Sequence, residues 1–159
     1  MFEKFTDRTR KIMALANRAA HQRGTRIIGD MEMLLGLLEE GRGVGAQILR
    51  KSGLDLKQTY TELFGTRSLL SFFLPMKPLP QTQEAKRIIE TAMSASASLE
   101  HDHVGSEHLL LAITMSANCA AAKALMERNV NETKVRQLIE QFPRNPQTNH
   151  VMVDESQRE

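Results

Sequence analysis

The sequence predicts an all-α fold made of two related halves. Three observations support this prediction: an internal repeat, apolar residues at helical spacing throughout, and no segment with the alternating pattern of a strand. Shifted against itself by about 76 residues, the chain aligns residues 6–63 with residues 82–139 without a gap. The matching pairs include Thr6/Thr82, Ile12/Ile88, Gly29/Gly105, Leu34/Leu110 and Leu49/Leu125. Because this period exceeds most solenoid units, it indicates a duplicated helical half-domain.

The size and composition of the chain are typical of one ordinary intracellular domain. Its 159 residues are 41% hydrophobic and 25% charged, with a formal net charge of +2. This balance gives no electrostatic reason to expect a nucleic acid or a membrane as partner. Cys119 is the only cysteine, so an intramolecular disulfide is excluded, and no apolar run reaches the roughly 18 residues of a membrane span. The first residues lack the apolar block of a secretory signal, and we expect a cytoplasmic protein.

The first helix of each half is predicted at about residues 6–23 and from about residue 82 onward. Thr6 is expected to cap the first of these helices and Gly24 to end it. The apolar positions expected to face the core are Ile12, Met13, Leu15, Ala16, Ala19 and Ala20 in the first half and Ile88, Ile89, Ala92 and Met93 in the second.

The second helix of each half is predicted to begin directly after Gly29 and Gly105. Asp30 and Ser106 follow these glycines, and we expect their side chains to accept hydrogen bonds from the first turn of their own helices. Both helices are then apolar on most sides, which indicates that they lie at the centre of the fold.

The third and fourth helices are short. The third helices are predicted at about residues 44–50 and 120–127, and Gly53 and Asn129, which both tolerate a left-handed backbone, follow them. The fourth helices are expected to start at Asp55 and Asn131 and to run to Leu63 and Phe142.

The repeats imply one domain over residues 1–142: a first repeat at about 5–63, a linker at 64–81 and a second repeat at about 82–142. The tail, residues 143–159, loses helical periodicity and is expected to be flexible. The linker is unusually apolar, and its prolines exclude a continuous helix through its end. Either it folds back across the groove between the halves, or Phe72 and Phe73 form a docking surface for a partner or a second copy of the chain.

Several segments together resemble a known family. FEKFTDRTRKIMALANRAA and IIGDMEMLLGLLEEGRGVGAQIL in the first half, and EAKRIIETAMSAS with HVGSEHLLLAI in the second, are similar to the N-terminal domain of Clp-family AAA+ unfoldases of the ClpC and ClpA type. The most specific element is a Gly-[Ser/Thr]-Glu-His-x-Leu-Leu block in each repeat. The resemblance covers about residues 2–142. It implies a bundle of eight helices with pseudo-twofold symmetry that sits above an ATPase ring and receives adaptors or substrates.

The resemblance also suggests where a ligand would bind. In some ClpC proteins the Glu of each block binds phosphorylated arginine. Here the second repeat retains this residue as Glu107, whereas the first repeat has Met31 in its place. The neighbouring Glu32 lies about 100° further around the helix. At most one phosphoarginine site is therefore expected, and Glu107 can alternatively act only on the helix dipole. The polar binding candidates are Glu107, Glu32, Ser106 and Asp30.

No feature of the chain predicts an enzyme. It has no Gly-x-x-x-x-Gly-Lys-[Ser/Thr] loop for nucleotide phosphates, and Cys119 is expected to be a buried small hydrophobe. His101, His103 and His108 offer a possible metal cluster, but no further ligand completes it, so we predict neither a metal nor another cofactor.

The sequence therefore predicts a non-enzymatic protein-interaction domain that recognises adaptors, substrate polypeptides or the unfoldase itself in Clp-type proteolysis. Two alternatives stay open. The chain is an excised regulatory part of a longer ClpC- or ClpA-type ATPase, or it is a helical bundle that binds a small ligand such as phosphoarginine between its halves. The identity of the partner and the oligomeric state are not predicted.

Overall fold

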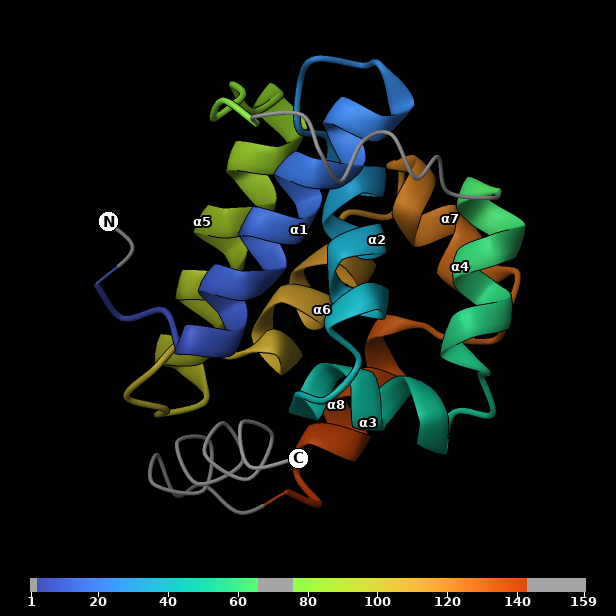
Figure 1. Ribbon diagram of the computed structural model, residues 1–159. Coiled ribbons are helices and arrows are strands. Elements are labelled where there is room, and N and C mark those ends of the chain that lie inside the picture. Colours follow the sequence, from blue (N-terminus) through green and yellow to red (C-terminus); the bar gives the residue numbers. More distant parts are fainter. Residues whose placement is uncertain (1–2, 66–75, 143–159) are drawn as a thin grey trace, which may run out of the picture.

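The computed structural model describes residues 3–65 and 76–142, which form eight α-helices (Figure 1). The helices are α1 (Asp7–Arg23), α2 (Asp30–Glu40), α3 (Val44–Lys51), α4 (Leu56–Phe64), α5 (Gln83–Ser98), α6 (Ser106–Met115), α7 (Ala120–Met126) and α8 (Glu132–Ile139). Within these two ranges, extended backbone pairs only in two isolated β-bridges. The all-α prediction is confirmed, with four helices in each half.

The second helix of each half lies at the centre, as predicted. Figure 1 shows α2 and α6 in the middle of the molecule, with α1 and α5 on one side and α4 and α7 on the other. Nine of the ten residues of α6 are buried. On α2, Gly36 allows α1 to approach closely, because a β-carbon there would lie 2.5 Å from the carbonyl oxygen of Ile12. The hydrophobic core is therefore continuous across both halves.

Most helix ends follow the predicted signals. Thr6 accepts a hydrogen bond from the Thr9 N–H at the start of α1, and Gly24 ends that helix with a left-handed backbone. The side chains of Asp55 and Asn131 cap α4 and α8. One end differs from the prediction: α8 stops at Ile139, and the chain reaches Phe142 through turns.

The predicted role of Asp30 and Ser106 is wrong in one respect, because each caps a helix of the other half. The N-cap positions of α2 and α6 are taken by Gly29 and Gly105, and Asp30 and Ser106 are already the first helical residues. Asp30 Oδ2 instead accepts from the Ala121 N–H in the first turn of α7 at 2.8 Å. Ser106 Oγ accepts from the Gly45 N–H in the first turn of α3, also at 2.8 Å. The two bonds are related by the 76-residue offset.

The extended segments before α1 and α5 also pair across the halves. Phe5 forms a parallel bridge with Val104, which precedes α6, and Gln81 forms one with Ile28, which precedes α2. The backbone bonds are Thr6 N–H to Val104 O, Val104 N–H to Lys4 O, Ile28 N–H to Pro80 O and Thr82 N–H to Ile28 O, at 2.8–3.1 Å. These bonds obey the same offset, so the pseudo-twofold symmetry extends to the connections.

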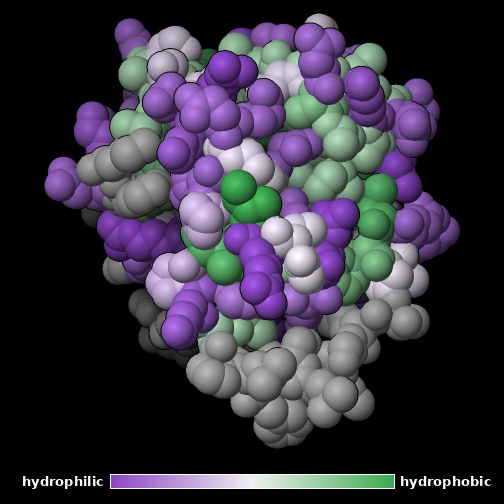
Figure 2. All heavy atoms as spheres, turned by 90° about the horizontal axis from the view of Figure 1, so that it is seen from above, coloured by the Kyte–Doolittle hydropathy of each residue, from purple (hydrophilic) through white to green (hydrophobic). Residues whose placement is uncertain are grey.

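Two sequence-based predictions lie outside the described residues: the docking role of Phe72 and Phe73, and the flexible tail at 143–159. The predicted repeat boundaries stay predictions. Among the residues coloured in Figure 2, hydrophilic side chains cover most of the face shown, with small hydrophobic spots between them. In the described part of the chain, no single helix is long and apolar enough to cross a membrane; α6 and α7 pass that test only together, across a 95° bend.

Removing a cross-half cap is expected to destabilise the whole domain. Ser106→Ala leaves the buried Gly45 N–H without its acceptor, and we expect a loss of about 1–2 kcal/mol in the free energy of unfolding. Urea denaturation followed by circular dichroism measures it. Ser94→Ala, at an exposed position of α5, is the control and should change stability little. Equal stability of the two variants would contradict the role assigned to Ser106.

Candidate functional site

Glu107 lies in the first turn of α6, and its side chain is folded inward. The side chain is only 8% exposed. Its carboxyl group fills the space beside Gly105, where a β-carbon would collide with both carboxyl oxygens. Burial raises the pKa of Glu107 to about 7, because the charged form loses its hydration there. Glu107 is therefore not presented on the surface as an ionised ligand group.

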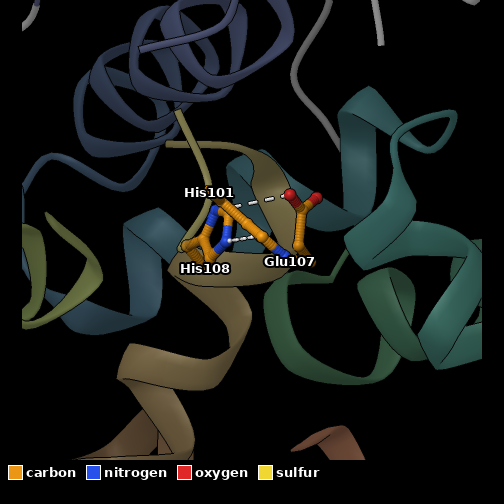
Figure 3. A group of neighbouring side chains, drawn as sticks. All are labelled: His101, Glu107 and His108. Atoms are coloured by element: carbon orange, nitrogen blue, oxygen red, sulfur yellow. Dashed lines mark hydrogen bonds and ion pairs between the residues drawn. The ribbon is translucent and has the colours of Figure 1, made fainter. Parts of the chain in front are cut away.

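His108, the next residue, is held in one protonation state by hydrogen bonds at both ring nitrogens, of which Figure 3 shows the one to His101. Its Nδ1 accepts from the Gly105 N–H at 2.8 Å, which closes a capping box at the start of α6. Since Nδ1 is the acceptor, the ring proton is on Nε2, and it is donated to Nδ1 of His101 at 2.7 Å. Burial, with a smaller effect of His101, lowers the pKa of His108 to about 3, so the imidazole is neutral.

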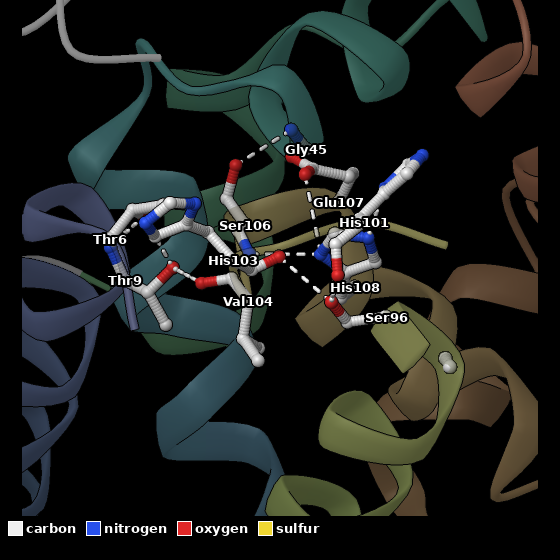
Figure 4. A network of polar contacts seen from close by, with 12 residues as sticks. Thr6, Thr9, Gly45, Ser96, His101, His103, Val104, Ser106, Glu107 and His108 are labelled. Atoms are coloured by element: carbon white, nitrogen blue, oxygen red, sulfur yellow. Dashed lines mark hydrogen bonds and ion pairs between the residues drawn. The ribbon is translucent and has the colours of Figure 1, made fainter. Parts of the chain in front are cut away.

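The loop that carries His101 is fixed from α5. Ser96 Oγ contacts the carbonyl oxygens of His101 and His103 at 3.2 and 2.8 Å, as part of the polar network in Figure 4. The His103 side chain itself is exposed and does not join the cluster. The prediction that the three histidines could act together is therefore limited to two of them.

The hydrogen bonds of His108 determine whether its ring can donate a proton to the Glu107 carboxyl group. Its Oε1 lies 3.3 Å from Nδ1 of His108, but that nitrogen has no proton to donate, because it already accepts from Gly105. The contact is thus not an ion pair. A neutral carboxyl group fits this environment better than a carboxylate does, in agreement with the direction of its pKa shift.

His101, Glu107 and His108 form a group of possible metal ligands whose donor atoms lie within 4.8 Å of one another. The hydrogen bonds do not fit a metal site. An ion on Nδ1 of His108 would break the capping bond from Gly105, and an ion on Nε2 would replace the proton donated to His101. The cluster is therefore built as a hydrogen-bonded network.

In the first half, a different side chain accepts the hydrogen bond from the glycine N–H at the start of the second helix. At the position of His108 stands Glu32, whose Oε2 accepts from the Gly29 N–H at 3.3 Å. Its Oε1 accepts from Thr25 Oγ1 at 3.1 Å, and Arg23 Nη1 lies 3.4 Å away. The Glu32 side chain is 6% exposed. Both its oxygens are used inside the protein, and the structure shows it capping α2. Its predicted binding role stays a prediction.

The sequence did not reveal a further candidate site, which is a groove of about 460 Å³ along α1. Its lining residues are Phe5, Arg10, Met13, Ala14, Asn17, Ile28, Pro78, Leu79 and Gln81. The only sequence signal was the cluster of apolar residues and prolines at the end of the linker, which is too general to place a groove. A second hollow of about 560 Å³ lies between α2 and α4 and ends at Gly65.

One wall of this α1 groove is backbone that α1 holds in place. Asn17 binds it twice: its Nδ2 donates to Lys77 O at 3.2 Å, and its Oδ1 accepts from the Leu79 N–H at 2.8 Å. The His21 ring also contacts Lys77 O, at 2.7 Å. Together with the pairing of Ile28 to residues 80–82, these bonds make the wall a fixed part of the fold.

The helix order, the duplication and the block around Glu107 agree with comparisons to known proteins. The family model of the Clp repeat (R) N-terminal domain matches residues 4–128 and again 81–157. The chain belongs to the Clp N-terminal domain family. It is 35% identical over 136 residues to the ATP-dependent Clp protease ATP-binding subunit ClpA homolog of Guillardia theta, and 34% identical over 136 residues to the chloroplastic chaperone protein ClpC of Pisum sativum. Each match covers 86% of this chain but only 16% and 15% of the relative.

Solved structures of Clp N-domains have the same fold. The N-terminal domain of ClpD from Arabidopsis thaliana superposes with a TM-score of 0.66 at 19% identity, and the match covers 87% of this chain and 93% of that one. A structure described as a peptide from the EAEC T6SS Sci1 SciI protein gives a TM-score of 0.66 at 19% identity, covering 87% and 88%. At this identity the likeness shows the fold alone.

The pKa of Glu107 makes stability depend on pH. Between its ordinary value of 4.5 and its folded value of about 7, the unfolded chain has lost a proton that the folded chain keeps. Stability therefore falls as the pH rises through this window, by at most about 3 kcal/mol. In Glu107→Gln this part of the decline should be absent. Urea denaturation of both proteins at pH 5, 6, 7 and 8 tests it, and parallel curves would show that Glu107 titrates normally.

Proposed function

We propose that this chain is a non-enzymatic docking domain that binds polypeptides for a Clp-type chaperone or protease system. The observation that supports this proposal best is the groove along α1. It is lined mainly by apolar side chains, and it has a volume in the range of known ligand sites. Its walls are fixed by Asn17 and Ile28, so little ordering is needed on binding.

The comparisons support the general kind of partner. Relatives of this chain are named as a Clp protease ATP-binding subunit and as a chaperone, and one structure with this fold is described by a peptide of another protein. We infer that the partners are a Clp-family ATPase, an adaptor protein or a substrate polypeptide. The chain spans only about a sixth of the length of those relatives. We therefore keep, as the alternative function, a regulatory N-domain of a longer ATPase.

The docking proposal predicts that a bulky charge in the groove blocks binding. Ala14 is exposed and lines the groove, so Ala14→Arg fills the groove without disturbing the core. We expect the affinity for a purified adaptor or Clp-family ATPase from the same cell to fall at least about tenfold. Ser94→Arg, which adds the same side chain at an exposed position of α5, is the control. Equal binding by both variants, measured by biolayer interferometry, would rule out the groove as the docking site.

Phosphoarginine recognition at Glu107 is a second candidate. It is supported by the Glu107 carboxyl group, which forms no ion pair with His108, since a guanidinium group would supply bidentate donors to a carboxylate turned outward. Met31 in the first half and the engaged oxygens of Glu32 leave a single such site.

A thermal-shift assay tests this candidate. If Glu107 binds the ligand, millimolar phosphoarginine raises the melting temperature of the wild type but not of Glu107→Gln. The shift should be larger at pH 8 than at pH 6, because binding needs the ionised carboxylate. Equal shifts in both proteins would place the ligand elsewhere.

A further inference from the structure

Met115 is the last residue of α6, and its sulfur lies beside a cation. Of the ten residues of α6, all of which the structure describes, nine are buried and Met115 alone is exposed, at 39%. Arg136 of α8 donates from Nη2 to the Met115 sulfur at 3.6 Å. We propose that Met115 is a modification site, at which hydrogen peroxide oxidises the thioether to a sulfoxide that Arg136 then holds. This proposal is independent of the proposed docking function.

The reaction transfers one oxygen atom from the peroxide to sulfur. A sulfur lone pair attacks one peroxide oxygen, the O–O bond breaks, and the other oxygen leaves as hydroxide. The hydroxide takes the proton from the transferred oxygen and becomes water. The thioether loses two electrons and the peroxide gains them. Because a thioether sulfur has two lone pairs, it can accept the hydrogen bond from Arg136 with one of them and react with the other.

Arg136 is placed to stabilise both the transition state and the product. Negative charge develops on the leaving oxygen as the O–O bond breaks, and a guanidinium group beside the sulfur favours that charge. The sulfoxide oxygen then replaces the weakly accepting sulfur, in a stronger charge-assisted hydrogen bond. Glu132 Oε1 holds the guanidinium group at Nε, 3.0 Å away, while Nη2 contacts the sulfur. Oxidation of Met115 would therefore strengthen the contact between α6 and α8.

Met126, the last residue of α7, provides an internal comparison. It is 56% exposed, more than Met115, and among the described residues no hydrogen bond reaches its sulfur. If exposure alone determined reactivity, Met126 would be oxidised first. The two side chains therefore separate the effect of solvent access from the effect of the neighbouring cation.

The first half carries other residues at the two equivalent positions. By the 76-residue offset, Glu39 corresponds to Met115 and Tyr60 corresponds to Arg136. Both line the hollow between α2 and α4, so the end of the second helix meets the fourth helix in each half. Neither a carboxylate nor a phenol takes up a peroxide oxygen as a thioether does. The duplication therefore yields this site once.

Timed oxidation of the full chain with hydrogen peroxide tests the proposal. Peptide mapping by tandem mass spectrometry gives the oxidation rate of each methionine, and Met115 should react faster than Met126. Arg136→Gln should lower the Met115 rate relative to Met126 by about three- to fivefold, as expected for one charge contact in water. Lys134→Gln removes the same charge from α8, where Lys134 contacts Asn129 O and not the sulfur, and should leave the ratio unchanged.

Thermal unfolding tests the hydrogen bond in the product. Met126→Leu removes the other exposed methionine of the described residues, so the melting temperature can be compared before and after Met115 is converted. It should rise by about 2 °C on oxidation, because the sulfoxide joins α6 to α8. Adding Arg136→Gln should abolish this rise.

Each result supports or overturns one part of the proposal. If Met126 of the wild type reacts as fast as Met115 or faster, exposure determines the order and Met115 is not a preferred site. If Arg136→Gln lowers the rate ratio no more than Lys134→Gln does, Arg136 does not assist the oxidation. If the melting temperature does not rise, or rises equally in Arg136→Gln, Arg136 does not hold the sulfoxide. The comparison within the wild type needs no variant, and circular dichroism checks the folding of the others.

Discussion

The fold depends on hydrogen bonds that each half supplies to the other. The first turns of α3 and α7 lie against the opposite half, where water cannot satisfy their N–H groups, and Ser106 and Asp30 provide the acceptors. The extended residues before α1 and α5 pair across the halves in the same reciprocal way. Neither half has a complete set of backbone partners alone. The same pairing holds residues 80–82 against Ile28, so the constraint that joins the halves also forms the wall of the groove.

The two halves keep one backbone arrangement while their side chains have diverged. Gly29 and Gly105 both donate to the residue three positions on, but the acceptor is the Glu32 carboxylate in one half and the His108 imidazole in the other. The residue that hydrogen-bonds to this acceptor side chain differs as well: it is Thr25 for Glu32 and His101 for His108. The first half thus contains a charged network and the second a neutral one. Glu107 lies beside the neutral network, and its burial there raises its pKa.

The sequence predicted what depends on periodicity and local signals. Eight helices, the duplication, the central position of α2 and α6 and the caps at Thr6, Asp55 and Asn131 follow from residues close together in the chain. It could not predict that Asp30 and Ser106 cap distant helices, because that depends on how the halves pack. The groove was missed for the same reason: Asn17 and Leu79 are 62 positions apart, and only the fold brings them together. The motif located Glu107 but not its inward orientation, in which the carboxyl group packs beside Gly105.

The close fit of the Glu107 carboxyl group to Gly105 couples these two positions. A β-carbon at position 105 would strike that carboxyl group, so the flexible end of the Glu107 side chain would have to move out of its place to admit one. A larger residue at position 105 is therefore expected to turn the carboxyl group towards water, where the ionised form is hydrated again.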